Sequence, residues 1–325
     1  MRLLRSIWFP ILIGLVICMI IVTDIFWGGS PSSIVQSAHR PFREDELWQA
    51  PDVNDIPSDA TGDRIRYGRE LVVNTARYLG PEGIVRQISN GTNCQNCHLD
   101  AGTRNFANPF SAVSSTYPKF RHRSGKVESI EFRVNECMQR SLNGEPLDSL
   151  SEEMRAFVAY LEWISQGVPK DHTPKGASTG DLAWLNRAAD PVRGKAIFTT
   201  QCQRCHGSNG EGIRSPQGGY QYPPLWGENS YNTSAGLYRL SRAAGFIKHN
   251  MPLDKPAGTY LSDEDAWDVA AFIAAQPRPE KTFVYDWPDI SRKPPDFPFG
   301  PFADPFPAQQ HKYGPFPPIV SFYKK

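Results

Sequence analysis

The sequence lacks an excess of charge of either sign. Lys and Arg total 35 against 34 Asp and Glu, which gives a formal net charge of +1 over 325 residues. Nucleic-acid binders carry a strongly basic domain or stripe, so this balance argues against a nucleic-acid partner. The hydrophobic fraction of 40% excludes a wholly disordered chain, and the length suits about two domains of roughly 150 residues each.

Lys and Arg are also absent between Arg5 and Arg40. This region contains Ser6–Thr23, an uncharged and mostly apolar stretch close to the roughly 20 residues that a membrane-spanning helix needs. Because Arg2 and Arg5 precede the stretch, the positive-inside rule places the N-terminus in the cytoplasm. We therefore expect residues 1–27 to be a single-pass transmembrane anchor in a bacterial inner membrane, with the domains facing the periplasm.

Two alternatives to an uncleaved anchor stay open. The first is a cleaved signal peptide, although the sequence lacks an Ala-x-Ala cleavage site and the apolar run is long for such a signal. The second is lipidation of Cys18, although Ile17 is bulky where a lipoprotein box has a small residue. All three interpretations place the bulk of the chain outside the cytoplasm.

Cysteine is scarce, and most of it lies in two short motifs. The six cysteines are Cys18, Cys94, Cys97, Cys137, Cys202 and Cys205. Four of them form C-x-x-C-H motifs, Cys94–His98 and Cys202–His206, which is the attachment signature of c-type haem. A thioredoxin-like motif does not require the histidine, and a compact zinc site would need the two pairs closer together. We predict two covalently attached haem c groups with iron, for which His98 and His206 are the proximal ligands.

The two motifs stand in similar surroundings. We expect helices at 62–78 and 190–200 before the motifs, and closing helices that begin at Ser149-Leu150-Ser151-Glu152, a capping-box pattern, and at 261–276. Irregular chain is expected between each motif and its closing helix. The closing helices are separated by nearly the same length of chain as the motifs, which indicates two tandem units.

The order of these elements resembles the class I cytochrome c fold, so the predicted architecture is mostly α. The expected boundaries are a linker at 28–57, cytochrome c-like domains at 58–168 and 181–276, and a C-terminal tail at 277–325. The tail is rich in proline, which argues against regular structure, but also in Phe, Tyr and Trp. Because disordered segments are poor in aromatic residues, we expect an extended strap that lies across the domains.

Each haem iron also needs a distal ligand. In the second domain the candidate is Met251, with Lys248 and His249 as alternatives; in the first domain the spacing does not choose among Cys137, Met138 and His122. A His/Met haem has a raised potential, which suits outward electron transfer. Cys137 has no cysteine left for an intramolecular disulfide, so its thiol is either buried and inert or has a function of its own.

A basic cluster surrounds Cys137 in the sequence. Its members are Arg121, His122, Arg123, Lys126, Arg133 and Arg140. Such clusters are often only solvated surface. Since this one is expected in a non-helical stretch beside a haem in an otherwise neutral chain, it also indicates an anion site.

The segment Arg133–Gly144 (RVNECMQRSLNG) resembles the signature of the bacterial dihaem thiosulfate dehydrogenases. The tail segments Phe299–Phe302 and Gln310–Phe316 resemble the end of the same family, and the similarity extends from about Asp63 onward. The resemblance implies the following roles: Cys137 as distal ligand of the first, catalytic haem, Arg123 and Arg133 as substrate-binding arginines, Ser141 as the active-site serine, and Met251, exchanged with Lys in some members, at the second haem.

The resemblance also implies a reaction in which two thiosulfate ions form tetrathionate and release two electrons. The electrons would pass to a periplasmic cytochrome or to a membrane-bound acceptor. The predicted anchor departs from the family, since many members are soluble. Two other functions remain as alternatives: a non-catalytic, membrane-anchored dihaem relay, and the same site working as a tetrathionate reductase.

Overall fold

The structure, a computed structural model, describes residues 42–324, which lie in a single unit of the chain. The predicted anchor at 1–27 and the first part of the predicted linker lie outside the described residues. Between residues 42 and 324, no helix combines the length and the apolar character that crossing a membrane requires.

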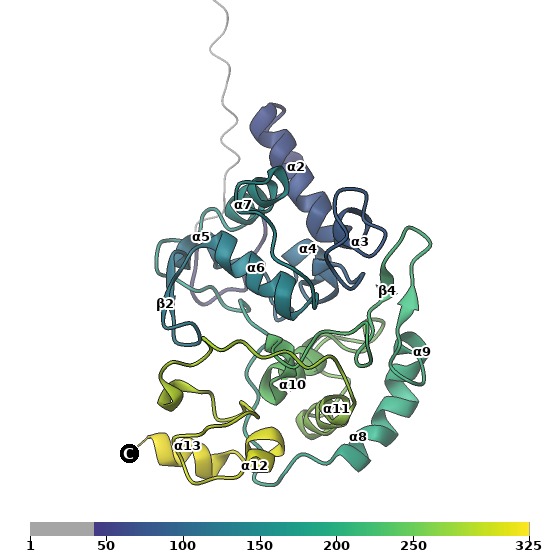
Figure 1. The fold of residues 1–325 in the computed structure, drawn as a ribbon, viewed down its shortest axis with the longest axis vertical. Helices are drawn as coiled ribbons and strands as arrows, with labels where there is room; N and C mark the ends of the chain where they lie inside the picture. Colours follow the sequence, from purple (N-terminus) through teal and green to yellow (C-terminus); the bar gives the residue numbers. More distant parts are fainter. Residues whose placement is uncertain (1–41, 325) are drawn as a thin grey trace, which may run out of the picture. The chain divides into compact units, whose positions relative to one another are not determined.

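The first half of the described chain is built on two long helices that pack against each other, α2 (Ala60–Val73) and α7 (Glu152–Ile164) (Figure 1). Between them follow, in chain order, α3 (Thr75–Leu79), α4 (Leu99–Gly102), α5 (Val113–Thr116), β1 (Lys119–Arg121), β2 (Lys126–Glu128) and α6 (Ile130–Arg140). β1 and β2 form an antiparallel hairpin in which Lys119 pairs with Glu128.

The second half repeats this plan. α8 (Pro191–Ile197) packs on α11 (Asp263–Ala275), and α11 also packs on α10 (Leu240–Asn250). A π-helical turn at Phe198–Cys202 leads from α8 into α9 (Gln203–His206), followed by the short antiparallel strands β3 (Ile213–Arg214) and β4 (Tyr220–Tyr222). The mostly α expectation with two tandem units is confirmed.

Capping side chains fix where the four framing helices begin. Each accepts a hydrogen bond from a backbone N–H of the first turn, and they are Asp59, Ser151, Asp190 and Ser262. Such a side chain satisfies a donor that has no partner within the helix. The closing helix predicted at 261–276 is confirmed as α11, which Ser262 caps with a capping box completed by Asp265. In the first domain the capping residue is Ser151 rather than Ser149, so the box predicted there is wrong.

One glycine in each domain lets the two framing helices approach closely. A Cβ at Gly68 of α2 would lie 1.9 Å from the carbonyl oxygen of Ala156 in α7. A Cβ at Gly194 of α8 would lie 1.9 Å from the carbonyl oxygen of Asp268 in α11. Only a residue without a side chain fits at either crossing, so both domains have a glycine where their framing helices cross.

The tail joins the second core rather than standing apart from it. Its Phe316 and Ile319 are buried among the side chains of α10 and α11, and the ring of Phe316 contacts those of Trp184 and Trp267. Contrary to the expectation, the tail is not wholly irregular, because it includes the short helices α12 (Ala308–Tyr313) and α13 (Pro317–Tyr323).

Two further expectations are corrected. The chain between each motif and its closing helix is not irregular, because α6 and α10 occupy it. Residues 42–57 are not a free linker either, since Trp48 and Ile56 are buried in the first core. The helix predicted at 62–78 is present as α2 and α3, which are separated at Asn74.

Candidate haem and anion site

A single cavity of about 1110 Å³ runs through both domains. It exceeds the roughly 300–1,000 Å³ of an ordinary small-molecule pocket. Both motifs contribute to its lining, through Cys94, Cys97, His98, Cys202, Cys205 and His206. None of these cysteines is in a disulfide. The thiols and imidazoles predicted to hold two haems therefore line one continuous cavity.

The hydrogen bonds of the two motif histidines leave one ring nitrogen of each available to bind iron. His98 Nδ1 lies 2.5 Å from the carbonyl oxygen of Asn108, and His206 Nδ1 lies 2.9 Å from that of Pro223. Since a carbonyl only accepts, each Nδ1 carries the proton and each Nε2 keeps the lone pair that a metal needs. Burial lowers the pKa of His98 to about 4 and also lowers the pKa of His206, so both imidazoles are neutral at physiological pH. The residues present fit c-type haem.

In the second domain only one of the three predicted distal candidates reaches the cavity. Met251 follows the last turn of α10 and lines the cavity. Lys248 instead donates from Nζ to the carbonyl oxygen of Leu261 at 2.7 Å. The Nδ1 of His249 lies 2.9 Å from the carbonyl oxygen of Gly245. The geometry therefore favours Met251.

In the first domain all three candidates, Cys137, Met138 and His122, line the cavity. Met138 is 1% exposed and packs in the hydrophobic core, whereas His122 lies in the turn of the β1–β2 hairpin. Cys137 lines the cavity beside the attachment cysteines. Burial raises the pKa of Cys94 to about 11 and the pKa of Cys97 to about 12. Cys137 is near enough to raise both pKa values further by its charge. This proximity favours Cys137.

The helix α6 places charged side chains around Cys137. Arg133 Nη1 donates to Glu136 Oε2 at 2.9 Å, and Arg140 Nη2 donates to Glu136 Oε1 at 2.9 Å. The charge of a Cys137 thiolate is the largest influence on Arg133 and raises its pKa. Within residues 42–324, Nε and Nη2 of Arg133 have no hydrogen-bond acceptor, so they are available to an anion in the cavity.

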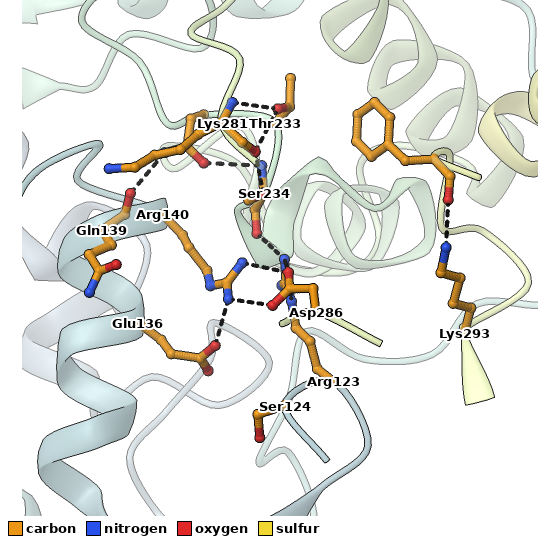
Figure 2. Close-up of polar contacts among 12 residues, drawn as sticks. Arg123, Ser124, Glu136, Gln139, Arg140, Thr233, Ser234, Lys281, Asp286 and Lys293 are labelled. Atoms are coloured by element: carbon orange, nitrogen blue, oxygen red, sulfur yellow. Dashed lines mark hydrogen bonds and ion pairs between the residues drawn. The ribbon is translucent and has the colours of Figure 1, made fainter. Parts of the chain in front are cut away.

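Two further arginines of the predicted basic cluster, besides Arg133, are already ion-paired (Figure 2). Asp286 of the tail accepts from Arg123 Nε at 2.9 Å, and from Nη1 and Nη2 of Arg140 at 2.8 Å each. Arg123 Nη2 also donates to the carbonyl oxygen of Ser234 at 2.9 Å. The cluster is therefore not a set of six free cations, and it is not confined to non-helical chain, because Arg133 and Arg140 stand on α6.

Sequence reasoning missed both carboxylates of this network. Glu136 had a local signal, since it stands three residues after Arg133 and four before Arg140, the spacing of neighbours on one helix face. Asp286 had none, because it lies in a proline-rich tail far along the chain from Arg123.

Other cations complete the wall of the cavity. Lys119 and Arg121 alternate with exposed Phe120 on β1, and both line the cavity together with Arg242 of α10. Burial and the nearby Arg121 lower the pKa of Lys119. Ser141, at the C-terminal end of α6, also lines the cavity. Arginine, lysine and hydroxyl donors thus face the same space as Cys137.

Comparison with known proteins agrees with this arrangement. The family described as "SoxA/TsdA, cytochrome c domain" matches residues 85–169, and the family described as "Cytochrome c" matches residues 191–276. A thiosulfate dehydrogenase of Stutzerimonas stutzeri is 37% identical over 249 residues, which cover 77% of this chain and 78% of that protein. Another, from Allochromatium vinosum, is 40% identical over 228 residues, covering 69% of this chain and 82% of that protein. The chain belongs to the thiosulfate dehydrogenase family.

A solved structure of a family member resembles the fold. Thiosulfate dehydrogenase (TsdBA) from Marichromatium purpuratum superposes with a TM-score of 0.67 at 32% identity. The match covers 72% of this chain and 50% of the other, so the chain spans half the length of that protein. As a member of the thiosulfate dehydrogenase family with two cytochrome c domains, the chain carries two covalently bound haem c groups.

Proposed function

We propose that the chain is a thiosulfate dehydrogenase whose reaction takes place beside Cys137 in the first domain. Two thiosulfate dianions lose one electron each, and a sulfur–sulfur bond forms between them to give the tetrathionate dianion. The observation that carries this proposal is the meeting of Cys137, Arg133 and the motif Cys94–His98 in one cavity. A relay cytochrome needs neither a thiol nor anion-binding donors at that place.

The chain's own residues meet the electrostatic demand of the reaction. Two dianions repel each other, and fixed donors that are already aimed at them offset that repulsion without reorganisation. The unpartnered nitrogens of Arg133 and the Nη1 of Arg123 can bind sulfonate oxygens, since arginine matches the geometry of oxyanions. The Ser141 hydroxyl lines the same cavity and can donate one further hydrogen bond.

The cofactors supply one-electron redox chemistry when they are bound, and the protein fixes their ligands. His98 and Cys137 would hold the first iron, and His206 and Met251 the second. A thiolate ligand favours the oxidised iron, whereas a methionine ligand raises the potential. With these ligands the second haem would have the higher potential, so the protein's choice of ligands would favour electron flow from the first domain to the second and on to an external acceptor.

We further propose that Ser6–Thr23 anchors the protein in the bacterial inner membrane and that both domains face the periplasm. The apolar, uncharged character of this segment and the two arginines before it support the proposal. The acceptor would then be a periplasmic cytochrome or a membrane-bound partner. Extraction of membranes with alkaline carbonate tests the anchor: the full chain should stay in the pellet, and its release into the supernatant would contradict anchoring.

The proposed reaction is tested by its stoichiometry. Full-length holoprotein in detergent, supplied with thiosulfate and ferricyanide, should form one tetrathionate for every two thiosulfates and two ferricyanides consumed. Reduced protein with tetrathionate would measure the reverse direction. Failure of both reactions in protein that still takes up electrons from dithionite would favour the relay cytochrome.

A further inference from the structure

The C-terminal tail is fastened to the end of the helix that carries Cys137. Lys281 Nζ donates to the carbonyl oxygen of Gly144 at 3.1 Å, just beyond α6, and the Lys281 carbonyl accepts from Ser234 Oγ at 2.5 Å. The second domain reaches the same place, since Asn232 Nδ2 donates to the Gln139 carbonyl oxygen at 2.8 Å. The last turn of α6 and the residues just after it are therefore held by two segments distant in sequence.

Asp286 is the centre of this contact (Figure 2). Asp286 Oδ2 accepts from Arg123 on the hairpin and from Arg140 Nη1 on α6, and Asp286 Oδ1 accepts from Arg140 Nη2. The side chain of Asp286 is 10% exposed, and that of Arg140 is 3% exposed. Paired geometry of this kind is directional as well as strong, so Asp286 fixes the hairpin turn relative to the helix.

Arg140 connects Asp286 to the residue next to Cys137. Its guanidinium lies between Asp286 and Glu136, and the ring of Phe283 lies 3.9 Å from its centre. Glu136 precedes Cys137 on α6 and also holds Arg133. A displacement of Asp286 would thus reach Cys137 through two ion pairs.

Asp286 also determines how Arg123 meets the cavity. With Nε bound to Asp286 and Nη2 to the Ser234 carbonyl, Nη1 is the nitrogen of Arg123 left without an acceptor among residues 42–324. Burial and Arg140 lower the pKa of Arg123 to about 10, and Asp286 acts against that shift. The next residue, Trp287, has a left-handed φ of 61° and donates its backbone N–H to the Arg123 carbonyl oxygen at 2.6 Å. A bulky residue in this conformation is held there by its surroundings.

We propose that Asp286 is a positioning residue of the thiosulfate site, which orients Arg123 toward the cavity and holds the Cys137 helix in register with the first haem. This inference rests on the proposed function for its kinetic part. It assigns to the tail a role in the active site, in addition to its packing on the second domain.

The test is Asp286→Asn in the full-length holoprotein. The amide keeps the shape of the side chain but cannot balance both arginines. The kcat for thiosulfate should fall by about 10-fold or more, since small displacements of catalytic groups have effects up to about 100-fold. KM should not rise, because a negative charge is lost beside an anion site.

The midpoint potential of the first haem, measured without thiosulfate, should move upward in Asp286→Asn. Asp286→Glu should restore most of the kcat.

Asp304→Asn is the matched control for the tail. Asp304 is a buried tail carboxylate that contacts His311 at 3.0 Å and does not line the cavity. This variant should lower stability without changing the potential of the first haem or kcat. Equal effects of Asp286→Asn and Asp304→Asn on kcat and potential, or no effect of Asp286→Asn on either, would overturn the proposal. If the wild type does not oxidise thiosulfate, the proposed function fails, and the potential of the first haem still decides the positioning role.

Discussion

Arg133 lies one helical turn before Cys137 on α6, and it joins the thiol to the anion site. Glu136 occupies its Nη1, which leaves Nε and Nη2 without acceptors in the part of the chain that the structure describes. The Cys137 thiolate raises the pKa of Arg133, so this side chain remains a cation through the physiological range. In the proposed reaction, Arg133 binds the substrate anion beside the Cys137 sulfur.

Replacement of Arg133 by Gln should therefore reduce kcat/KM for thiosulfate by about 10- to 100-fold, the equivalent of a charge-assisted hydrogen bond of about 1.5–3 kcal/mol. Steady-state kinetics with ferricyanide measures this change. Arg64→Gln, an exposed position on α2, is the control and should leave kcat/KM unchanged. Wild-type kinetics in Arg133→Gln would mean that the cluster is only solvated surface.

At the scale of elements, each domain depends on the close crossing of its framing helices. Gly194→Ala should destabilise the second domain by about 1–3 kcal/mol, because the added methyl group meets the carbonyl oxygen of Asp268 and the helices must separate. Chemical denaturation monitored at the haem bands measures the loss. Lys195→Ala, at an exposed neighbouring position on α8, should be tolerated. Equal stability of the two variants would show that the crossing is not tightly packed.

The sequence predicted the elements whose causes are local. The helix start at Ser262 and the haem motifs each depend on a few neighbouring residues. α6 was not predicted, although the spacing of Arg133, Glu136 and Arg140 is a local sign of a helix. The tail partner of Arg140, Asp286, lies outside any window of sequence. Asp286 was missed for the same reason: its two arginines precede it by well over a hundred residues.

At the scale of the whole molecule, tail carboxylates contact both domains: Asp286 pairs with arginines of the first domain, and Asp296 pairs with the second. Asp296 has no exposed side-chain area and accepts from Arg239 Nη2 at 2.6 Å and from Ser241 Oγ at 2.5 Å. Burial acts to raise its pKa, but Arg239 and the hydrogen bonds from Ser241 outweigh burial, and the pKa is lowered. Its contribution to stability is thus complete above the usual aspartate pKa of about 3.9 and is lost as the pH falls through the lowered value.

Asp296→Asn should therefore lower the free energy of unfolding at pH 7 by about 3 kcal/mol, the cost of breaking a buried ion pair. The loss should shrink as the pH falls below about 4, where the wild type loses the same interaction. Urea unfolding at several pH values measures both effects. Asp181→Asn, whose side chain is 90% exposed, should show neither. A difference between Asp296→Asn and the wild type that is constant down to the lowest pH would contradict this account.

The central claim is that thiosulfate gives its electrons at the first haem, beside Cys137. The most direct measurement is rapid mixing of oxidised, full-length holoprotein with thiosulfate while the haem absorption bands are recorded, for the wild type and for Cys137→Gly. The wild-type haems should become reduced as tetrathionate forms, whereas Cys137→Gly should stay oxidised although dithionite still reduces both of its haems. Prompt reduction of Cys137→Gly by thiosulfate would contradict the account.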